Sequence, residues 1–220
     1  MRSFEEIYTI AVERKGVDAL EAGLEKPKTT AELAAIPEDR WLSQMTRSIF
    51  QAGFNWKVVD NMWSGFEEAF KGFDPNPCAF MPDDWFDELV SDRRIVRHGP
   101  KIRAVQANAQ FICDLRDEGG LAKIIADWPS SDYAGLLEML KKRGTRLGGM
   151  TGTYFLRFMG RDSYILSRDV TARLIAEGVI EKAPTSKSAM KTVQQAFNVW
   201  ADQSNRSMTE ISRVLAQSIG

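Results

Sequence analysis

The sequence predicts an all-α protein. Helical patterns of apolar residues follow one another along most of the 220 residues, whereas the best strand signal is the short run 163–166. A hydrophobic content of 44% is enough to bury a sizeable core. We therefore expect one compact helical domain over residues 1–220, built as a single large domain or as two closely packed lobes.

The helices are predicted from apolar residues at helical spacing. In the range 56–70, Val59, Trp63 and Phe66 fall on one face, as in a helix that faces the core. Similar patterns predict the other helices, at residues 4–22, 39–51, 83–90, 102–112, 136–143, 153–159, 170–177, 187–201 and 208–218. The last of these begins with a capping box formed by Ser207 and Glu210. Polar connections lie near residues 25–30 and 183–186.

Several classes of protein are excluded by the composition. No run approaches the roughly 18 apolar residues of a membrane-spanning helix, and the first residues lack the layout of a signal peptide. Cys78 and Cys113 are too few for a disulfide framework, and with the single His98 they match no metal-ligand spacing. We expect a soluble, cytoplasmic protein whose thiols are buried or inert.

A glycine-rich turn between two helical patterns is the strongest local signal. The amphipathic run 136–143 leads through Gly144, Gly148, Gly149 and Gly152 into a second helix. Glycines allow positive φ and bring backbone N–H groups close to a phosphate, and the second helix adds partial positive charge at its N-terminus. The pattern predicts a helix-hairpin-helix element at about 136–160 that binds DNA without reading its sequence; an ordinary tight corner is the alternative.

Charge is distributed unevenly, although the net charge is −1. Residues 91–173 contain 15 Lys and Arg against 9 Asp and Glu, so this span carries +6 and the remainder −7. A local excess of this size attracts a polyanion, although charge clusters are also typical of solvated helix faces. The candidate DNA-binding residues in this span are Lys101, Lys142, Arg143, Arg146, Gly149, Thr151, Gly152 and Thr153.

Five short blocks follow one another over about 100 residues: QAGFNW at 51–56, FDP at 73–75, IVRHGPKI at 95–102, NA at 108–109 and LKKRG at 140–144. In this order they resemble the DNA-3-methyladenine glycosylase I family. The resemblance extends over residues 39–169. It implies the two-lobed helical fold of the helix-hairpin-helix DNA glycosylases, in which a cleft receives a flipped base.

The chain departs from this family in its zinc site and in its base pocket. The family's zinc site uses cysteines and histidines near both termini, and their absence here leads us to expect no zinc; a monovalent cation at the hairpin is compatible with the pattern. The family's base-recognising glutamate, eight residues before the pocket tryptophan, is replaced by Ser48 ahead of Trp56. Gly152, Thr153 and Tyr154 stand where bifunctional members carry a lysine nucleophile, which implies a monofunctional enzyme.

Asp169 is the candidate catalytic residue. It follows Gly149 by 20 residues, close to where the wider superfamily places its catalytic aspartate. An N-glycosidic bond breaks through an oxocarbenium-like transition state, which a carboxylate against the sugar stabilises. The alternative role is an N-cap of the helix 170–177, and one residue can serve both roles.

A flipped base is held by flat apolar surfaces, and a cationic alkylated base gains about 0.5 to 2 kcal/mol from an aromatic face. The candidate base-binding residues are Trp56, Ser48, Trp41 and Tyr154, with packing in the core as the alternative for each aromatic ring. His98 precedes the helix 102–112 and is interpreted as a local cap or packing residue.

Together these features predict a monofunctional DNA glycosylase that hydrolyses the N-glycosidic bond of an alkylated purine such as 3-methyladenine. Its partner is damaged double-stranded DNA, and we expect a monomer with no membrane partner. A DNA-binding module of the same fold with weak or no catalytic activity is the alternative, which the loss of the glutamate and of the zinc residues favours.

Overall fold

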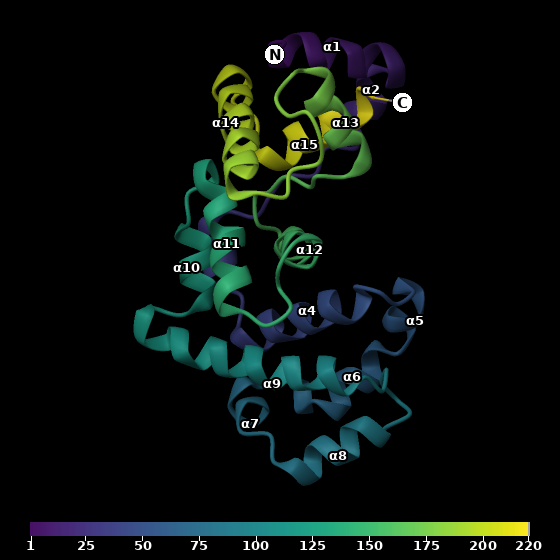
Figure 1. Ribbon diagram of the computed structural model, residues 1–220, viewed down its shortest axis with the longest axis vertical. Helices are drawn as coiled ribbons and strands as arrows, with labels where there is room; N and C mark the ends of the chain where they lie inside the picture. Colours follow the sequence, from purple (N-terminus) through teal and green to yellow (C-terminus); the bar gives the residue numbers. More distant parts are fainter. Residues whose placement is uncertain (220) are drawn as a thin grey trace. The chain divides into compact units, whose positions relative to one another are not determined.

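Every regular element of the computed structural model, which describes residues 1–219, is a helix (Figure 1). The prediction of an all-α protein is confirmed. The weak strand signal at 163–166 corresponds to a segment that forms no strand within the described range. Across residues 1–219, no helix is long and apolar enough to span a membrane.

The chain forms two compact units, each assembled from segments that are separate in the sequence. The first unit contains residues 1–28, 128–135 and 160 onward, and the second contains residues 29–127 and 136–159. One helix, α11 (Tyr133–Arg143), begins in the first unit and continues in the second. A single domain over the whole chain remains a prediction.

The first unit is built around α15. Its helices are α1 (Phe4–Lys15), α2 (Val17–Ala22), α13 (Arg168–Ala176), α14 (Lys187–Ser204) and α15 (Met208–Gln217). The predicted helix 4–22 is interrupted at Gly16, whose φ of 77° is open to glycine and not to most residues. The predicted capping box is confirmed, since Glu210 N donates to Ser207 Oγ and Ser207 N donates to the Glu210 carboxylate.

The second unit contains the hairpin and most of the blocks noted above. Its helices are α3 (Thr30–Ala34), α4 (Glu38–Gln51), α5 (Trp56–Asn61), α6 (Trp63–Ala69), α7 (Pro75–Ala79), α8 (Asp83–Ser91), α9 (Gly99–Asp114), α10 (Leu121–Asp127) and α12 (Met150–Met159). The predicted helix 56–70 is two helices, α5 and α6, which meet at Met62. Helix α4 packs against both α9 and α12.

A polar network joins α4 to α6 in this unit. The Glu67 carboxylate accepts two bonds of 2.9 Å from Arg40 and one of 2.7 Å from Ser43. Burial raises the pKa of Glu67, but these hydrogen bonds outweigh burial and hold the pKa below its ordinary value. The network fixes the two helices that flank α5 in the sequence, and α5 begins with Trp56.

Candidate nucleic-acid interface

The hairpin joins α11 to α12 through residues 144–149. Gly149 has φ of 59°, the left-handed conformation that the sequence predicted for this turn. Gly152 is required for a different reason: a Cβ there would lie 2.3 Å from the carbonyl oxygen of Leu147. Gly149 therefore sets the turn, and Gly152 lets the loop pack directly on the first turn of α12.

A buried amide on α9 holds the hairpin loop. Asn108 Nδ2 donates to the carbonyl oxygen of Thr145 at 3.0 Å, and Thr145 N donates to Asn108 Oδ1 at 2.8 Å. Asn108 has no exposed surface, whereas Thr145 is exposed, so both bonds are partly buried. Arg146 directly follows this clamp and has φ of 61°, which is uncommon for a residue with a side chain. Local spacing did not reveal the role of Asn108, although it stands in the block 108–109, because its partner lies 37 residues away.

The predicted cations of the hairpin differ in their freedom to meet a phosphate. Arg146 is exposed and has no ion-pair partner among residues 1–219. Lys142 is also exposed and lies 3.7 Å from the Glu138 carboxylate. Arg143, in contrast, forms two hydrogen bonds with Glu118, at 2.8 and 2.6 Å. Arg146 and Lys142 are the hairpin side chains that can contact a polyanion without first breaking a close pair.

Lys101 has a structural role in place of the predicted phosphate contact. Its ammonium donates to the carbonyl oxygens of Ile49 at 2.7 Å, Phe50 at 3.3 Å and Ala52 at 2.5 Å. These carbonyls end α4, where a cation is favoured by the helix dipole. The residue is only 6% exposed, and burial lowers the pKa of its ammonium. The positive charge therefore stabilises a helix end and is not available to DNA.

The two threonines at the start of α12 are placed differently. Thr153 is buried, and its hydroxyl donates to the carbonyl oxygen of Gly149 at 3.3 Å, so its side chain serves the turn and not a ligand. Thr151 is half-buried in the first turn of α12. Thr151 remains a candidate for contact with a phosphate.

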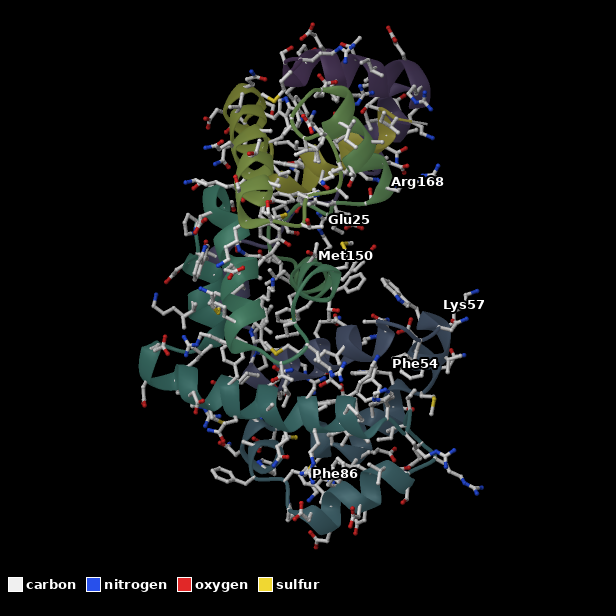
Figure 2. The ribbon with its side chains drawn as sticks, in the orientation of Figure 1. Glu25, Phe54, Lys57, Phe86, Met150 and Arg168 are labelled. Atoms are coloured by element: carbon white, nitrogen blue, oxygen red, sulfur yellow. The ribbon has the colours of Figure 1, made fainter. Side chains whose placement is uncertain are left out.

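Three aromatic rings form a cluster on the second unit. Trp56 lies against Tyr154, with ring centroids 5.1 Å apart, and against Phe158, at 5.9 Å. Tyr154 and Phe158 stack on each other at 5.8 Å. Trp56 is 40% exposed and Phe158 46% exposed, so the cluster presents apolar ring surface to solvent. Figure 2 labels Lys57, which follows Trp56 in α5, and Met150, which is exposed at the start of α12.

The structure brings together two of the predicted base-binding residues, Trp56 and Tyr154, and adds Phe158. The sequence did carry a signal for Phe158, because a residue four positions after Tyr154 lies on the same face of a helix.

Two other predicted base-binding residues lie inside the unit. Trp41 is fully buried, donates from its indole N–H to the carbonyl oxygen of Ile36 at 3.1 Å, and meets Phe155 edge-on. The prediction that Trp41 binds a base is wrong, because core packing uses both the ring and its polar atom. Ser48 is also buried, and its hydroxyl accepts a bond of 3.2 Å from Gln44.

Asp169 lies in the first turn of α13, in the first unit. The N-cap of that helix is Ser167, whose hydroxyl accepts from Val170 N at 3.2 Å, so the N-cap role considered for Asp169 is wrong. Asp169 is exposed, and within residues 1–219 its carboxylate has no hydrogen-bond or ion-pair partner. A carboxylate in this turn is favoured by the helix dipole and remains free to act on a ligand.

His98 is the N-cap of α9. Its Nδ1 accepts from Lys101 N at 3.3 Å, and its ring meets Phe54 edge-on at 5.9 Å. The interpretation of His98 as a local cap is confirmed. No group of three or more His, Cys, Asp or Glu side chains in the described part of the chain is arranged to hold a metal ion.

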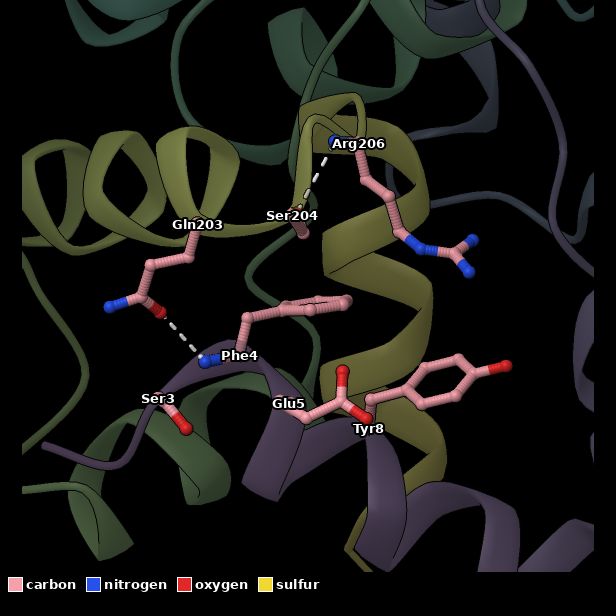
Figure 3. A pocket seen from close by; sticks show the side chains of 7 residues that line it. All are labelled: Ser3, Phe4, Glu5, Tyr8, Gln203, Ser204 and Arg206. Atoms are coloured by element: carbon pink, nitrogen blue, oxygen red, sulfur yellow. Dashed lines mark hydrogen bonds between the residues drawn. The ribbon is translucent and has the colours of Figure 1, made fainter.

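A pocket of about 570 Å³ opens in the first unit beside α1 and the junction of α14 and α15 (Figure 3). Its polar groups are engaged by the protein itself. Gln203 Oε1 accepts from Phe4 N at 2.8 Å, and Glu21 accepts from both the Tyr8 hydroxyl and the Arg206 guanidinium at 2.6 Å. None of the predicted site residues lines this pocket.

Residues 36–132 match the model of the methyladenine glycosylase family. The DNA-3-methyladenine glycosylase 1 of Escherichia coli (strain K12) is 29% identical, over a region that covers 47% of this chain and 66% of that protein. Over these residues the chain is similar to the methyladenine glycosylase family. The family resemblance inferred from the five blocks is confirmed.

Solved structures extend the methyladenine glycosylase comparison to the fold. A crystal structure of 3-methyladenine DNA glycosylase I gives a TM-score of 0.50 at 22% identity and covers 65% of this chain and 86% of that one. The 8-oxoguanine DNA glycosylase of Thermotoga maritima gives a TM-score of 0.51 at 17% identity and covers 96% and 95%. The predicted helical glycosylase fold is confirmed, and the second likeness includes α13 to α15, which lie outside the family match.

Proposed function

We propose that this protein is a DNA glycosylase that removes an alkylated purine from duplex DNA by hydrolysis. The arrangement of α12 is the observation that carries the proposal. Its N-terminus receives the hairpin loop at Gly149, and one turn later the same helix presents Tyr154 and Phe158 to Trp56. A single rigid helix can therefore offer N–H groups to a phosphate and a stacking surface to a base.

The aromatic cluster and Asp169 have different roles in the proposed reaction. A flipped base stacks on the aromatic cluster, the bond between the base and C1′ breaks, and the base leaves with the bonding electrons. Water then adds to C1′ and loses a proton, which leaves an abasic site. The Asp169 carboxylate stabilises the cationic sugar in the transition state. The residues at 152–154 include no lysine, which supports hydrolysis over a Schiff-base route.

The neutral side chain at Ser48 bears on the choice of base. Its hydroxyl is buried and accepts from Gln44, so this position offers no carboxylate to a purine amino group. Discrimination then depends on stacking and on cation–π attraction, which favours alkylated bases that carry positive charge. We propose alkylated purines of the 3-methyladenine type as the substrate class.

The same serine favours a second candidate, a module that binds distorted DNA without cutting it. Loss of a recognition carboxylate weakens catalysis more than it weakens phosphate contacts, because those contacts come from the hairpin. Release of free base separates the two candidates. The purified protein is incubated with an alkylated duplex, and the released purine is measured by chromatography.

Asp169→Asn is the decisive variant, and Asp202→Asn, an exposed aspartate on α14, is its matched control. We expect the wild-type protein to release the base, and we expect Asp169→Asn to lower the rate of release by at least about a hundredfold. The control should release the base at the wild-type rate. Duplex affinity should be unchanged or tighter in Asp169→Asn, since a negative charge is removed. Tight binding without release in the wild type supports the non-catalytic module, and normal release by Asp169→Asn excludes the role of that carboxylate.

A further inference from the structure

The extended segment 161–167, which leads into α13, is held by side chains of α15. Ser163 N donates to Thr209 Oγ1 at 3.1 Å, and the same hydroxyl donates to the carbonyl oxygen of Ser163 at 3.2 Å. Two residues further, Ile165 N donates to Ser212 Oγ at 3.0 Å, and that hydroxyl donates back to the carbonyl oxygen of Ile165 at 3.4 Å. We name these four bonds the hydroxyl ladder.

The periodicities of the two elements explain the ladder. In extended backbone, the N–H and C=O groups of residues 163 and 165 point to the same side. On α15, positions 209 and 212 are three residues apart and share one face. Each hydroxyl both donates and accepts, so it can replace the two bonds that a neighbouring strand would supply. Thr209 and Ser212 are therefore matched to the spacing of this segment.

The ladder is buried and reinforced. Ser163 has no exposed surface, and Thr209 and Ser212 are 3% and 4% exposed, so the two bonds at Ser163 are buried and the two at Ile165 are partly buried. The intervening Tyr164 is also buried and stacks on Phe197 with centroids 4.3 Å apart. The segment cannot slip by one residue without breaking the ladder and removing Tyr164 from its site.

The ladder ends immediately before the candidate catalytic residue. Ile165 is two residues before Ser167, the N-cap of α13, and Asp169 is two residues after it. We propose that Thr209 and Ser212 are positioning residues, an inference that rests on the proposed function. They fix the register in which the chain enters α13 and thereby place the Asp169 carboxylate. Neither hydroxyl is required to touch DNA.

The test uses Thr209→Val, which keeps the shape of the side chain and removes its hydroxyl, together with Ser212→Ala. Single-turnover release of the base and duplex affinity are measured well below the melting temperature. We expect the release rate to fall by about tenfold to a hundredfold, because displacement by about 1 Å has that effect on a positioned group, while affinity stays within about twofold. Thr209→Ser should restore the rate.

Two comparisons separate positioning from a general loss of stability. Ser204→Ala removes a hydroxyl that bonds to the Trp200 carbonyl elsewhere in the same unit, and it should leave the rate unchanged. In the Asp169→Asn background, Thr209→Val should cause no further loss, because its effect passes through Asp169. The proposal is overturned if the losses of rate caused by the two substitutions multiply in the double variant. It is also overturned if Thr209→Val keeps the wild-type rate.

Amide hydrogen exchange tests the same positioning without using activity. Thr209→Val should speed exchange at residues 165–170, and Ser204→Ala should not. Unchanged exchange in Thr209→Val overturns the positioning role. If the wild-type protein releases no base but Thr209→Val still speeds exchange at residues 165–170, the proposed function is contradicted and the ladder's control of the entry into α13 is supported.

Discussion

The indole of Trp56 meets the ring of Tyr154 edge-on, with centroids 5.1 Å apart and ring planes at 89°. A base held between two parallel rings needs about 7 to 8 Å between them, twice the contact distance of carbon atoms. The two rings therefore cannot enclose a base in this arrangement. A base stacks instead on a free face of the aromatic cluster, which acts as one wall.

Replacement of Trp56 tests this wall. Trp56→Phe should lower release of a cationic alkylated base several-fold, because indole provides the stronger cation–π face. The partly exposed ring should contribute less to stability than the roughly 3 to 5 kcal/mol of a fully buried aromatic residue, so even Trp56→Ala should remain folded. Release kinetics and thermal melting measure the two effects, with the buried Trp41→Phe as the control for a change in the core. Unchanged release in Trp56→Ala would contradict a stacking role.

The clamp of Asn108 on Thr145 predicts a variant with a local effect on DNA binding. Asn108→Leu keeps a similar volume but removes both hydrogen bonds to the Thr145 backbone, each of which contributes about 0.5 to 1.5 kcal/mol. We expect a lower melting temperature and weaker duplex affinity in the fraction that remains folded. Gln110→Leu, on the exposed face of the same helix, is the control. Wild-type affinity in folded Asn108→Leu would show that the loop geometry does not matter for binding.

Arg146 and Arg143 should respond differently to removal of charge. Arg146 is exposed without an ion-pair partner among the described residues, whereas Arg143 is paired with Glu118. Arg146→Ala should weaken binding to all duplex sequences and lower the salt slope by about one, and Arg143→Ala should do less. Fluorescence anisotropy at several salt concentrations gives both slopes. A larger effect of Arg143→Ala would place the DNA on the other side of the hairpin.

The lowered pKa of Glu177 predicts how the stability of the protein depends on pH. Burial raises the pKa of this carboxyl, but hydrogen bonds from the backbone and side chain of Arg2 and from Arg173 lower it by more. The net pKa lies below the ordinary value of 4.5. Its contribution to stability is therefore present above the pKa of the unfolded chain and is lost as the pH falls through the folded pKa. Glu177→Gln should be less stable at pH 7 and should flatten the stability curve below about pH 4.5. Urea unfolding between pH 3 and 7 measures both, and a parallel curve for the variant would contradict this assignment.

Local patterns predicted most helices and the hairpin, because these features depend on neighbours a few positions apart. Trp56 and Tyr154 were both named as base-binding candidates, but they lie 98 positions apart, so local spacing could not predict their contact. Trp41 and Lys101 were misplaced because residue type does not reveal burial. Trp41 has a polar atom that the Ile36 carbonyl satisfies, and Lys101 meets a helix end that lies about 50 residues earlier in the sequence. The clamp by Asn108 also depends on tertiary contact, which spacing alone cannot show.

The hydroxyl ladder also bears on strand pairing between molecules. An extended segment usually exposes a row of unpaired N–H and C=O groups, which can recruit a strand from another molecule. Here Thr209 and Ser212 satisfy that row at residues 163 and 165, and they lie on a helix, which cannot add a further strand. The β-prone run 163–166 is thus shielded from intermolecular pairing as long as α15 remains folded, and partial unfolding of α15 would expose an aggregation-prone edge.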